Sequence, residues 1–304
     1  MQHIPVLYEE VIKCLKPYES GKYVDGTVGS GGHAKGILQA SGPNGMLLGL
    51  DIDSYAVKVA NRTLKTFGER AILKTASYVE MDKCVSDMGW YKVDGIILDL
   101  GLSSQQLEDA QRGFSFNLEG PLDMRFDTTG ELMADEIVNN WSQHQIAKIL
   151  YELGDENQSK KIAKALVNER PIESTVQLAQ IVAHCKRHSK VGRHVATKTF
   201  QALRIAVNKE IDNIINVLPK ALEILVPGGR LAIIAFHSLE DRLVKRFFRQ
   251  ESQDCLCPPE QIVCVCGHHA TITRVNPRPI RPKNREIMTN RRSRSARLRI
   301  AEKI

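Results

Sequence analysis

Three aspartates stand at the ends of apolar segments in the first third of the chain: Asp25, Asp51 and Asp99. The first is followed by the run Gly26-Thr27-Val28-Gly29-Ser30-Gly31-Gly32-His33 and then by the amphipathic residues 34–40. Glycine has no Cβ, so a backbone N–H can approach a ligand closely, and the N-terminus of a helix favours negative charge. This combination indicates a nucleotide-like ligand, and several cofactor classes are bound by similar turns.

The turn does not match the phosphate-binding loop of ATPases and GTPases. That motif needs Gly-x4-Gly-Lys-Ser/Thr, whereas Ala34 takes the place of the second glycine and Gly36 that of the hydroxyl residue. Without the hydroxyl the contact to Mg²⁺ is lost, which excludes ATP or GTP hydrolysis. Gly29-x-Gly31-x-x-Ala34 matches the dinucleotide fingerprint instead, and Asp51 follows about 20 residues later, where an acid binds ribose hydroxyls. NAD and S-adenosylmethionine both carry such hydroxyls.

The residues around the turn favour S-adenosylmethionine over NAD. Asp25 suits a cationic amino-acid group better than a pyrophosphate, and Asp99 offers a further acid near an adenine or a substrate amine. Pro227-Gly228-Gly229-Arg230-Leu231 stands before a buried strand, as is common in methyltransferases. An NAD-dependent oxidoreductase is the alternative at this point.

The N-terminal half alternates short apolar segments with helical patterns. Residues 54–67 have helical spacing, with Ser54 as the expected cap. We expect strands at residues 22–25, 46–51, 71–73 and 93–99. Nearly continuous Ile, Leu and Val in strands separated by helices predict an α/β fold with a parallel sheet covered on both faces. Such folds bind ligands at the carboxyl ends of the strands, where the three aspartates lie.

From residue 108 the alternation gives way to helical patterns. We expect helices at 146–151, 160–169 and 178–184, the first opened by a capping box at Ser142 and Gln145 and the last capped by Ser174. The sheet pattern returns with a helix at 211–225, a strand at 230–236 and an edge strand at 270–275. The predicted organisation is therefore a discontinuous domain, residues 1–107 and 197–304, and an inserted, mostly helical domain, residues 108–196.

The net charge of +7 is carried by the C-terminal segment. Residues 274–304 contain eleven Lys and Arg against two Glu, which is +9 and leaves −2 for the rest of the chain. A basic segment indicates a polyanionic partner such as nucleic acid, with a solvated tail as the alternative. Pro277, Pro279 and Pro282 interrupt the segment, so we expect it to lie extended across a surface.

Length and composition indicate a cytoplasmic protein with a large core. The chain has 304 residues, 42% of them hydrophobic, which suits one domain with an insertion or two domains. No run approaches the roughly 20 apolar residues of a membrane helix. Residues 1–5 do not begin a signal peptide, and seven cysteines in a chain of this length do not form a secreted disulfide framework. We therefore expect no membrane partner.

Six ordered motifs carry a closer resemblance, which covers nearly the whole chain. They are Asp25-Gly26-Thr27-x-Gly29-x-Gly31-Gly32-His33, Asp99-Leu100-Gly101-x-Ser103-Ser104-x-Gln106, Arg112-Gly113-Phe114-Ser115-Phe116, Gly120-Pro121-Leu122-Asp123-Met124-Arg125, Thr199-Phe200-Gln201-Ala202-Leu203-Arg204-Ile205 and Phe236-His237-Ser238-Leu239-Glu240-Asp241-Arg242. With these motifs the chain resembles the RsmH (MraW) family of ribosomal RNA cytosine-N4 methyltransferases.

The resemblance implies a class I (Rossmann-like) S-adenosylmethionine methyltransferase fold with a mostly helical inserted domain for RNA recognition. It implies N4-methylation of a cytidine in the decoding centre (P-site region) of bacterial 16S rRNA in the small ribosomal subunit. The positions that match the family's cofactor contacts are Gly31, Gly32, His33, Asp51, Asp99 and Gln106. The family also has an aromatic contact after the third strand, for which we take Tyr78 rather than Ser77.

Asp99 is the predicted catalytic residue. The lone pair of the cytosine N4 amine is delocalised into the ring, so an acceptor for one of its N–H groups would localise that pair and stabilise developing positive charge. Many amine methyltransferases place Asp/Asn-Pro-Pro-Tyr after this strand, whereas this chain has Asp99-Leu100-Gly101-Leu102. Methylation at ring carbon C5 needs a cysteine nucleophile, typically after a proline, and the sequence has no Pro-Cys dipeptide.

Two further pairs are candidates for the substrate pocket. His237 and Ser238 follow a strand and belong at the carboxyl edge of the sheet, with a structural turn as the alternative. Asp123 and Arg125 would line the RNA cleft or form an ion pair that orders their own loop. For Phe114 and Phe116, stacking on a flipped base competes with burial under the inserted domain, which we favour.

The last candidate site is Cys255-x-Cys257-x6-Cys264-x-Cys266, with His268 and His269 nearby. Four thiolates in twelve residues would hold a structural zinc ion, although the spacing within each pair is C-x-C rather than the usual C-x2-C. A reduced loop without metal is the alternative we favour. Together with the basic segment, the cluster would also fit a non-enzymatic RNA-binding module, the second alternative to a methyltransferase.

Overall fold

The computed structural model describes residues 5–186, 194–261 and 263–304. Residues 1–4, on which part of the signal-peptide prediction rests, lie outside them. The chain divides into two compact units: a sheet unit, Met1–Gly101 with Asp212–Ile304, and a helical unit, Leu102–Ile211. The helical unit extends beyond the predicted 108–196 at both ends. Helix α10 (Thr197–Asn208) packs on α7 (Gln143–Gly154) and shares its core, and before residue 108 Leu102 and Leu107 pack against the same core.

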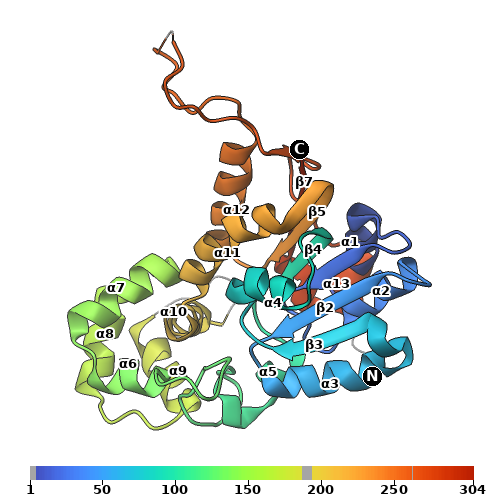
Figure 1. Ribbon diagram of the computed structural model, residues 1–304. Coiled ribbons are helices and arrows are strands. Elements are labelled where there is room, and N and C mark those ends of the chain that lie inside the picture. The colour runs from blue at the N-terminus through green and yellow to red at the C-terminus, as the bar shows by residue number, and fades with distance from the viewer. Residues whose placement is uncertain (1–4, 187–193, 262) are drawn as a thin grey trace. The chain divides into compact units, whose positions relative to one another are not determined.

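The sheet unit is built on one seven-stranded sheet with the order β3-β2-β1-β4-β5-β7-β6 (Figure 1). Neighbouring strands from β3 to β5 are parallel, whereas β7 is antiparallel to both β5 and β6. The strands are β1 (Lys22–Asp25), β2 (Met46–Asp51), β3 (Ala71–Thr75), β4 (Val93–Asp99), β5 (Leu225–Ala235), β6 (Ile272–Arg274) and β7 (Arg297–Lys303). This is the class I Rossmann-like methyltransferase fold, as predicted.

Helices cover both faces of the sheet because neighbouring residues of its central strands point to opposite sides. Leu48 joins a core with α4 (Met81–Asp87), α11 (Glu210–Ile224) and α12 (Ser238–Glu251). Leu47 joins a second core with α1 (Tyr8–Leu15), α2 (Gly32–Ala40) and α3 (Ser54–Leu64) (Figure 1). A central strand buried on both faces must be apolar along its length, which is why these strands were predictable.

The strands β1, β2 and β4 have the predicted bounds, and β6 is an edge strand as expected. The helix predicted at 54–67 ends at Leu64, where a 3₁₀ helix (Lys65–Arg70) begins. Its cap is Asp53, not Ser54: Oδ1 of Asp53 accepts a hydrogen bond from the N–H of Tyr55 at 2.9 Å.

The prediction that the basic C-terminal segment lies extended across a surface is wrong for much of its length. It contains β6, a short helix α13 (Asn284–Thr289), a 3₁₀ helix (Arg291–Ser295) and β7, which is paired on both sides within the sheet. The charges conceal a strand because the buried Leu298 and Ile300 alternate with Arg297 and Arg299, and Arg299 is itself buried in an ion pair with Asp241.

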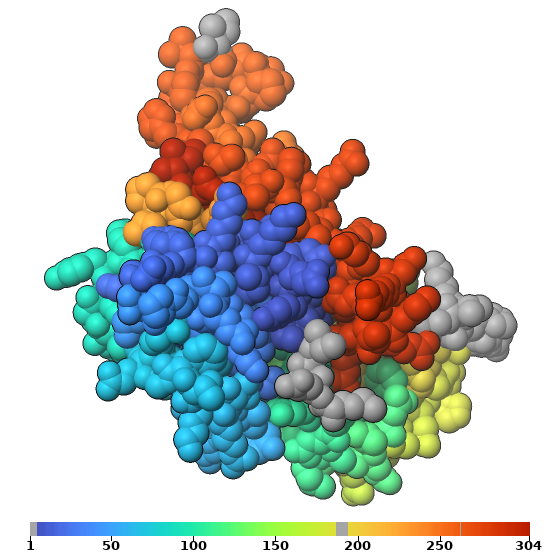
Figure 2. Space-filling view, turned by 90° about the vertical axis from the view of Figure 1, so that its right-hand side faces the viewer, coloured from blue at the N-terminus to red at the C-terminus, as the bar shows by residue number. Residues whose placement is uncertain are grey.

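Eight of the eleven cations of this segment nevertheless remain exposed: Arg274, Arg278, Arg281, Lys283, Arg285, Arg291, Arg292 and Arg294. Part of the segment lies beside the start of the chain, as Figure 2 shows where red atoms meet dark blue ones. There Oε1 of Glu286 accepts a hydrogen bond from the N–H of Leu7 at 2.9 Å. The N-terminal residues and α13 thus support each other from opposite ends of the sequence.

The helical unit has one hydrophobic core of its own, which includes Phe114. The remaining helices of this unit are α5 (Ser104–Glu108), a 3₁₀ helix (Ala110–Arg112), α6 (Ala134–Asn140), α8 (Ser159–Asn168) and α9 (Thr175–Cys185). The capping box at Ser142 and Gln145 opens α7, and Ser174 caps α9, both as predicted. In the described residues, no helix has the length and apolar character needed to cross a membrane.

Candidate functional site

The glycine-rich turn after β1 is joined to the neighbouring strands by backbone hydrogen bonds. The N–H of Gly26 donates to the carbonyl of Ile97 at 3.0 Å, and that of Val28 donates to the carbonyl of Leu50 at 2.8 Å. The hydroxyl of Thr27 accepts from the N–H of Asp99 at 2.6 Å. The turn is thereby fixed against the carboxyl ends of β2 and β4, where folds of this class bind ligands.

Glycine is required in the turn for conformation and for space. Gly31 precedes α2 with φ of 85°, a backbone conformation that side chains disfavour. A Cβ at Gly32 would lie 2.3 Å from Cγ of Pro5. The N–H groups of Gly26, Gly29 and Gly31 all donate to acceptors in the protein. These three N–H groups therefore shape the turn, and contact of Gly31 and Gly32 with the cofactor stays a prediction.

Asp51 holds the turn from the end of β2. Its Oδ2 accepts a hydrogen bond from the N–H of Gly29 at 2.9 Å, and its Oδ1 accepts from the N–H of Asp53 at 2.9 Å. The side chain is half-buried, so part of the carboxylate faces solvent at the sheet's carboxyl edge. Asp51 therefore supports the glycine turn, and its contact with a ribose stays a prediction.

Asp25 is the most deeply buried of the three strand-end acids, with 2% of its surface exposed. Burial raises the pKa of Asp25 to about 7, although its hydrogen bond from the N–H of Thr27 opposes that rise, and the nearby Asp51 adds to it. The N–H of Ala34, in the first turn of α2, also interacts with this carboxyl group. Asp25 therefore accepts a backbone N–H in the first turn of α2, and it also places an acidic group at the site.

Asp99 and His33 form the centre of the candidate site. Nε2 of His33 lies 3.7 Å from Oδ2 of Asp99, and the ring of His33 stacks on that of Tyr8 with 6.3 Å between centroids. The other carboxylate oxygen, Oδ1 of Asp99, is buried and has no hydrogen-bond partner among the described residues. Burial, together with the negative charges of Asp25 and Glu240, raises the pKa of Asp99 to about 8.

Tyr78 lies beside the glycine turn. Tyr78 begins the 3₁₀ helix Tyr78–Glu80, and a Cβ added to Gly26 would lie 3.0 Å from the Cβ of Tyr78. Ser77 is engaged as the cap of that helix, since its Oγ accepts a hydrogen bond from the N–H of Val79 at 3.3 Å. The position next to the turn supports Tyr78 over Ser77 as the aromatic cofactor contact, which stays a prediction.

The segment after β5 brings a further carboxylate to this edge of the sheet. Glu240, which is 1% exposed, accepts hydrogen bonds from the N–H groups of Phe236 at 2.8 Å and His237 at 3.3 Å. Its Oε1 also lies 3.1 Å from Nε2 of His237. Ser238 is the first residue of α12. Glu240 belongs to the motif His237-Ser238-x-Glu240-Asp241, which the sequence placed at this edge, although only His237 and Ser238 were among the predicted site residues.

The other predicted site residues belong to the helical unit. Gln106 is buried in α5, where its side-chain oxygen accepts a hydrogen bond from the N–H of Ser103 at 3.1 Å. Asp123 and Arg125 form a two-pronged ion pair, with Nε to Oδ1 at 2.9 Å and Nη2 to Oδ2 at 2.7 Å. The guanidinium of Arg125 holds the pKa of Asp123 below its usual value in spite of burial. The ion pair orders this loop, which is the structural alternative for both residues.

Phe114 is buried, as expected, whereas Phe116 is only half-buried. Phe116 stacks on the ring of His194 with 4.4 Å between centroids and meets Phe200 edge to face. Phe114 stacks on Phe126 with 5.6 Å between centroids, so both rings have ring partners within the helical unit.

The four clustered cysteines lie in a separate segment between α12 and β6. Their sulfur atoms all lie within 4.8 Å of one another, and His268 and His269 are not part of the group. Cys14, Cys84 and Cys185 stand apart, and burial raises the pKa of each of these three thiols.

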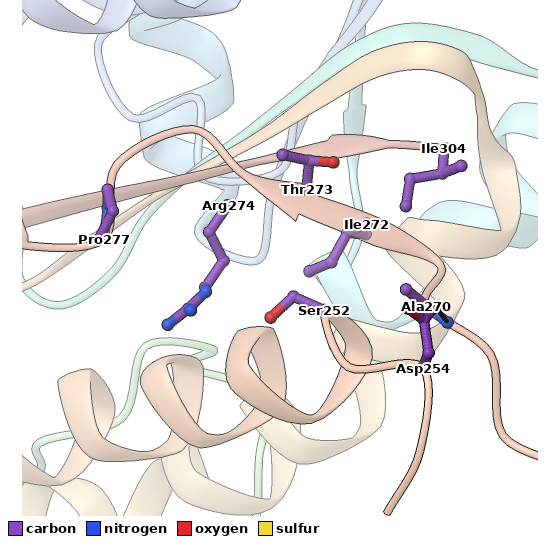
Figure 3. Close-up of a pocket in the computed structure, with 8 residues that line it drawn as sticks. All are labelled: Ser252, Asp254, Ala270, Ile272, Thr273, Arg274, Pro277 and Ile304. Atoms are coloured by element: carbon purple, nitrogen blue, oxygen red, sulfur yellow. Dashed lines mark hydrogen bonds between the residues drawn. The ribbon is translucent and has the colours of Figure 1, made fainter.

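A hollow of about 400 Å³ lies at the root of this cysteine segment (Figure 3). Side chains from β6 and from the end of α12 line it, among them Ser252, Asp254 and Arg274, and Ile304 closes one side. None of the three strand-end aspartates reaches it, and it has no convergent carboxylates comparable to those around Asp99. We therefore place the functional site at the glycine turn and not at this hollow.

Comparison with known proteins gives consistent results. The family model described as the MraW methylase family matches residues 1–304. A protein of Thermomicrobium roseum named ribosomal RNA small subunit methyltransferase H is 48% identical over 99% of this chain and 94% of its own length. A protein of the same name from Heliobacterium mobile is 44% identical over 99% of both chains. Among solved structures, a putative methyltransferase of Streptococcus mutans, crystallised with SAH, aligns over 99% of this chain and 100% of its own, with 12% identity and a TM-score of 0.47.

Proposed function

Because this chain belongs to the MraW methylase family, we propose that it transfers a methyl group to N4 of a cytidine in the decoding centre (P-site region) of bacterial 16S rRNA. The chain is a methyltransferase with S-adenosylmethionine as its cofactor. The name shared by its relatives supports ribosomal RNA of the small subunit as the substrate. The base, the atom and the position in the RNA belong to the proposal.

The observation that carries the proposal is the environment of Asp99. A buried carboxylate oxygen with no hydrogen-bond partner among the described residues is costly unless a ligand supplies a donor. The negative charges of Asp25 and Glu240 both raise the pKa of Asp99 at this edge of the sheet. Such a site suits a ligand that carries positive charge and N–H donors, as a sulfonium cofactor and an exocyclic amine do.

When bound, S-adenosylmethionine supplies a methyl group that its sulfonium centre has already activated. The protein then has to align the acceptor with that methyl group and exclude water. In our proposal Asp51 binds the ribose, and Tyr78 and the turn around Gly31 enclose the cofactor. Oδ1 of Asp99 accepts one N–H of the cytosine amine, which localises the nitrogen lone pair and stabilises the positive charge that develops on it.

The positions of the cysteines argue against methylation of the ring carbon C5. That reaction needs a cysteine thiolate at the site. Cys14 is on α1, Cys84 on α4 and Cys185 on α9, and the remaining four are clustered beyond α12. No cysteine of the described residues stands at the carboxyl end of a sheet strand, which argues against C5 as the acceptor.

The exposed cations of residues 274–294 supply the electrostatic attraction that an RNA substrate needs. We assign RNA recognition to this basic surface and to the helical unit. An enzyme that acts on bacterial ribosomal RNA works in the cytoplasm, where that RNA is assembled into subunits.

Neither alternative from the sequence has an observation in its favour. An NAD-dependent oxidoreductase would use the same turn, but the chain belongs to a family of methylases. A non-enzymatic RNA-binding module would not need three interacting carboxyl groups around a glycine turn.

The experiment that tests the proposal uses small subunits from a bacterial strain that lacks this gene. Incubation with S-adenosylmethionine labelled in its methyl group should label the RNA of these subunits, but not that of subunits from the parent strain, whose site is already methylated. The Asp99→Asn variant should transfer little label under the same conditions. Equal labelling of both kinds of subunit, or none of either, would contradict the assignment.

A further inference from the structure

Residues 252–271 form an arm between the end of α12 and the start of β6, which leaves the body of the sheet unit and returns to it (Figure 1). Hydrogen bonds close its root. The N–H of Thr271 donates to the carbonyl of Glu251 at 2.8 Å, and that of Ala270 donates to Oδ1 of Asp254 at 3.3 Å. Nε2 of His268 lies 3.1 Å from the carbonyl oxygen of Gln250. The root is thus fixed while the rest of the arm extends outward.

Four sulfur atoms meet in this arm. The Sγ of Cys255 lies 3.4 Å from that of Cys264 and 3.8 Å from that of Cys266, and the last two are 3.6 Å apart. Cys257 completes the group, in which all four sulfurs lie within 4.8 Å of one another. These contacts are too long for disulfide bonds, whose S–S distance is about 2.05 Å, and all four cysteines are free.

The spacing of the sulfurs fits the coordination shell of one metal ion. Zinc is bound by four thiolates at the corners of a tetrahedron, with Zn–S distances of about 2.3 Å, which puts neighbouring sulfurs about 3.8 Å apart. The three sulfur distances, 3.4, 3.6 and 3.8 Å, lie close to that edge length. A single ion therefore fits between them without rearrangement of the backbone.

Backbone N–H groups already point at the sulfurs. Leu256 donates to Sγ of Cys266 at 3.3 Å, Cys257 to Sγ of Cys255 at 3.4 Å, and Val265 to Sγ of Cys257 at 3.5 Å. Such donors stabilise the negative charge of metal-bound thiolates and orient them. Both C-x-C pairs contribute sulfur atoms to the group and N–H groups that donate to those sulfurs. The C-x-C spacing, which argued against zinc in the sequence, is therefore compatible with four ligands around one ion.

The described residues of the arm form no hydrophobic core. None of the described side chains from 252 to 271 is buried, and Val263 and Val265 are 71% and 73% exposed. The hollow between the root and β6 shows that packing is incomplete there as well (Figure 3). A segment without buried apolar side chains cannot offset the entropy of ordering its backbone. Something other than packing must bring the four thiols together.

From these observations we propose that Cys255, Cys257, Cys264 and Cys266 bind one structural zinc ion, which folds the arm. The ion has four protein ligands and no open position, so its role is structural rather than catalytic. Ring nitrogens are not needed, because the sulfurs complete the shell and His268 is engaged at the root. The site is separate from the methyl-transfer site and does not depend on the reaction assigned to it.

Metal analysis of the full-length protein tests this proposal. Protein purified without chelators or a metal-affinity step should contain about one zinc per chain. The Cys264→Ser variant should lose most of it, whereas Cys14→Ser, which removes an isolated thiol elsewhere in the same unit, should keep it. Cobalt added to zinc-free wild-type protein should give the visible and near-ultraviolet bands of a tetrahedral tetrathiolate site, and Cys264→Ser should not.

A second measurement separates loss of metal from general misfolding. Removal of zinc should expose the arm to limited proteolysis within residues 252–271. Binding of S-adenosylmethionine should be unchanged, because Asp51 and Asp99 lie elsewhere in the sheet unit, at the carboxyl ends of β2 and β4. Wild-type protein with no zinc and seven titratable thiols would overturn the proposal. So would two disulfide bonds among the four cysteines, or one equivalent of iron in place of zinc.

Discussion

Nε2 of His33 and Oδ2 of Asp99 lie 3.7 Å apart, one at the start of α2 and the other at the end of β4. The Thr27 hydroxyl, which accepts from the N–H of Asp99, ties the two elements together through the glycine turn. Oδ1 of Asp99 is buried and has no hydrogen-bond partner among the described residues, so it can accept a hydrogen bond from a ligand. The pair therefore links the cofactor turn to the strand end at which we place the target amine.

Replacing Asp99 by Asn should lower kcat for methyl transfer by about 10²–10³, the usual effect of removing one group that stabilises transition-state charge. The amide keeps the shape but loses the negative charge. Single-turnover assays with labelled cofactor measure this rate directly. Asp87→Asn is the control, since Asp87 is exposed on α4 and makes only a long ion pair with Lys74. Turnover close to that of the wild type in Asp99→Asn would remove Asp99 from the mechanism.

The stability of the cofactor-free protein should fall as pH rises from about 4 to about 8. Burial raises the pKa values of Asp25 to about 7 and Asp99 to about 8, so in this range the folded protein holds protons that the unfolded chain has released. Asp123 and Asp241 have lowered pKa values, so the stability that they contribute is lost at lower pH, as the pH falls. Urea unfolding across this range should show a shallower decline for Asp99→Asn than for the wild type, and equal slopes would contradict the shifted pKa.

Affinity for S-adenosylmethionine should rise with pH through the range of about 7 to 8. A positively charged ligand binds the ionised carboxylates better, so binding must release protons from Asp25 and Asp99. Calorimetry in buffers of different ionisation enthalpy measures this release. S-adenosylhomocysteine, which lacks the sulfonium charge, provides the control and should show a weaker dependence. An affinity for S-adenosylmethionine that does not change with pH would contradict this prediction.

Asp51→Ala should weaken cofactor binding and destabilise the sheet unit together. The substitution leaves the N–H groups of Gly29 and Asp53 without their acceptors, at a cost on the order of 2 kcal/mol for hydrogen bonds to a charged group. Equilibrium binding and urea unfolding report the two effects. Asp53→Asn is the matched control, because asparagine is as good a helix cap as aspartate. Loss of affinity with unchanged stability would show that Asp51 acts on the cofactor alone.

Asp123→Ala and Arg125→Ala should each lower the free energy of unfolding of the protein by about 2–3 kcal/mol, because each leaves a partly buried charge without its partner. The double variant should cost less than the sum of the two. Lys160→Ala, at an exposed position of α8, is the control. Unchanged stability combined with a loss of RNA binding would assign the pair to the substrate and not to the loop.

Much of the sheet and its ligand-binding edge could be predicted because buried parallel strands consist of unbroken apolar runs. The bounds of β1, β2 and β4 followed from this, and so did the three aspartates at their ends. β7 was not predicted because Arg297 and Arg299 give it the composition of a charged tail. Their ion pairs with Asp241 are seen only in the folded structure. A partner 56 residues away is not visible in local spacing.

The sequence predicted which acids end the strands but not how they are held. Spacing predicted Asp51 as a ligand contact, which stays a prediction, whereas its bonds to Gly29 and Asp53 depend on the three-dimensional path of the turn. Glu240 was predicted only as part of a polar motif, because its hydrogen bonds to the N–H groups of Phe236 and His237 depend on the path of the chain between β5 and α12. The C-x-C spacing of the cysteines argued against a metal, whereas the fold of the arm brings the four sulfurs together.

The chemical identity of the methylated nucleoside tests the central claim most directly. Small subunits from a strain lacking the gene should be incubated with the purified protein and deuterium-labelled S-adenosylmethionine, and the RNA digested to nucleosides for mass spectrometry against standards. We predict that the label appears in N4-methylcytidine and that Asp99→Asn incorporates much less of it in the same time. Label in 5-methylcytidine or in another nucleoside, with N4-methylcytidine unlabelled, would contradict the account.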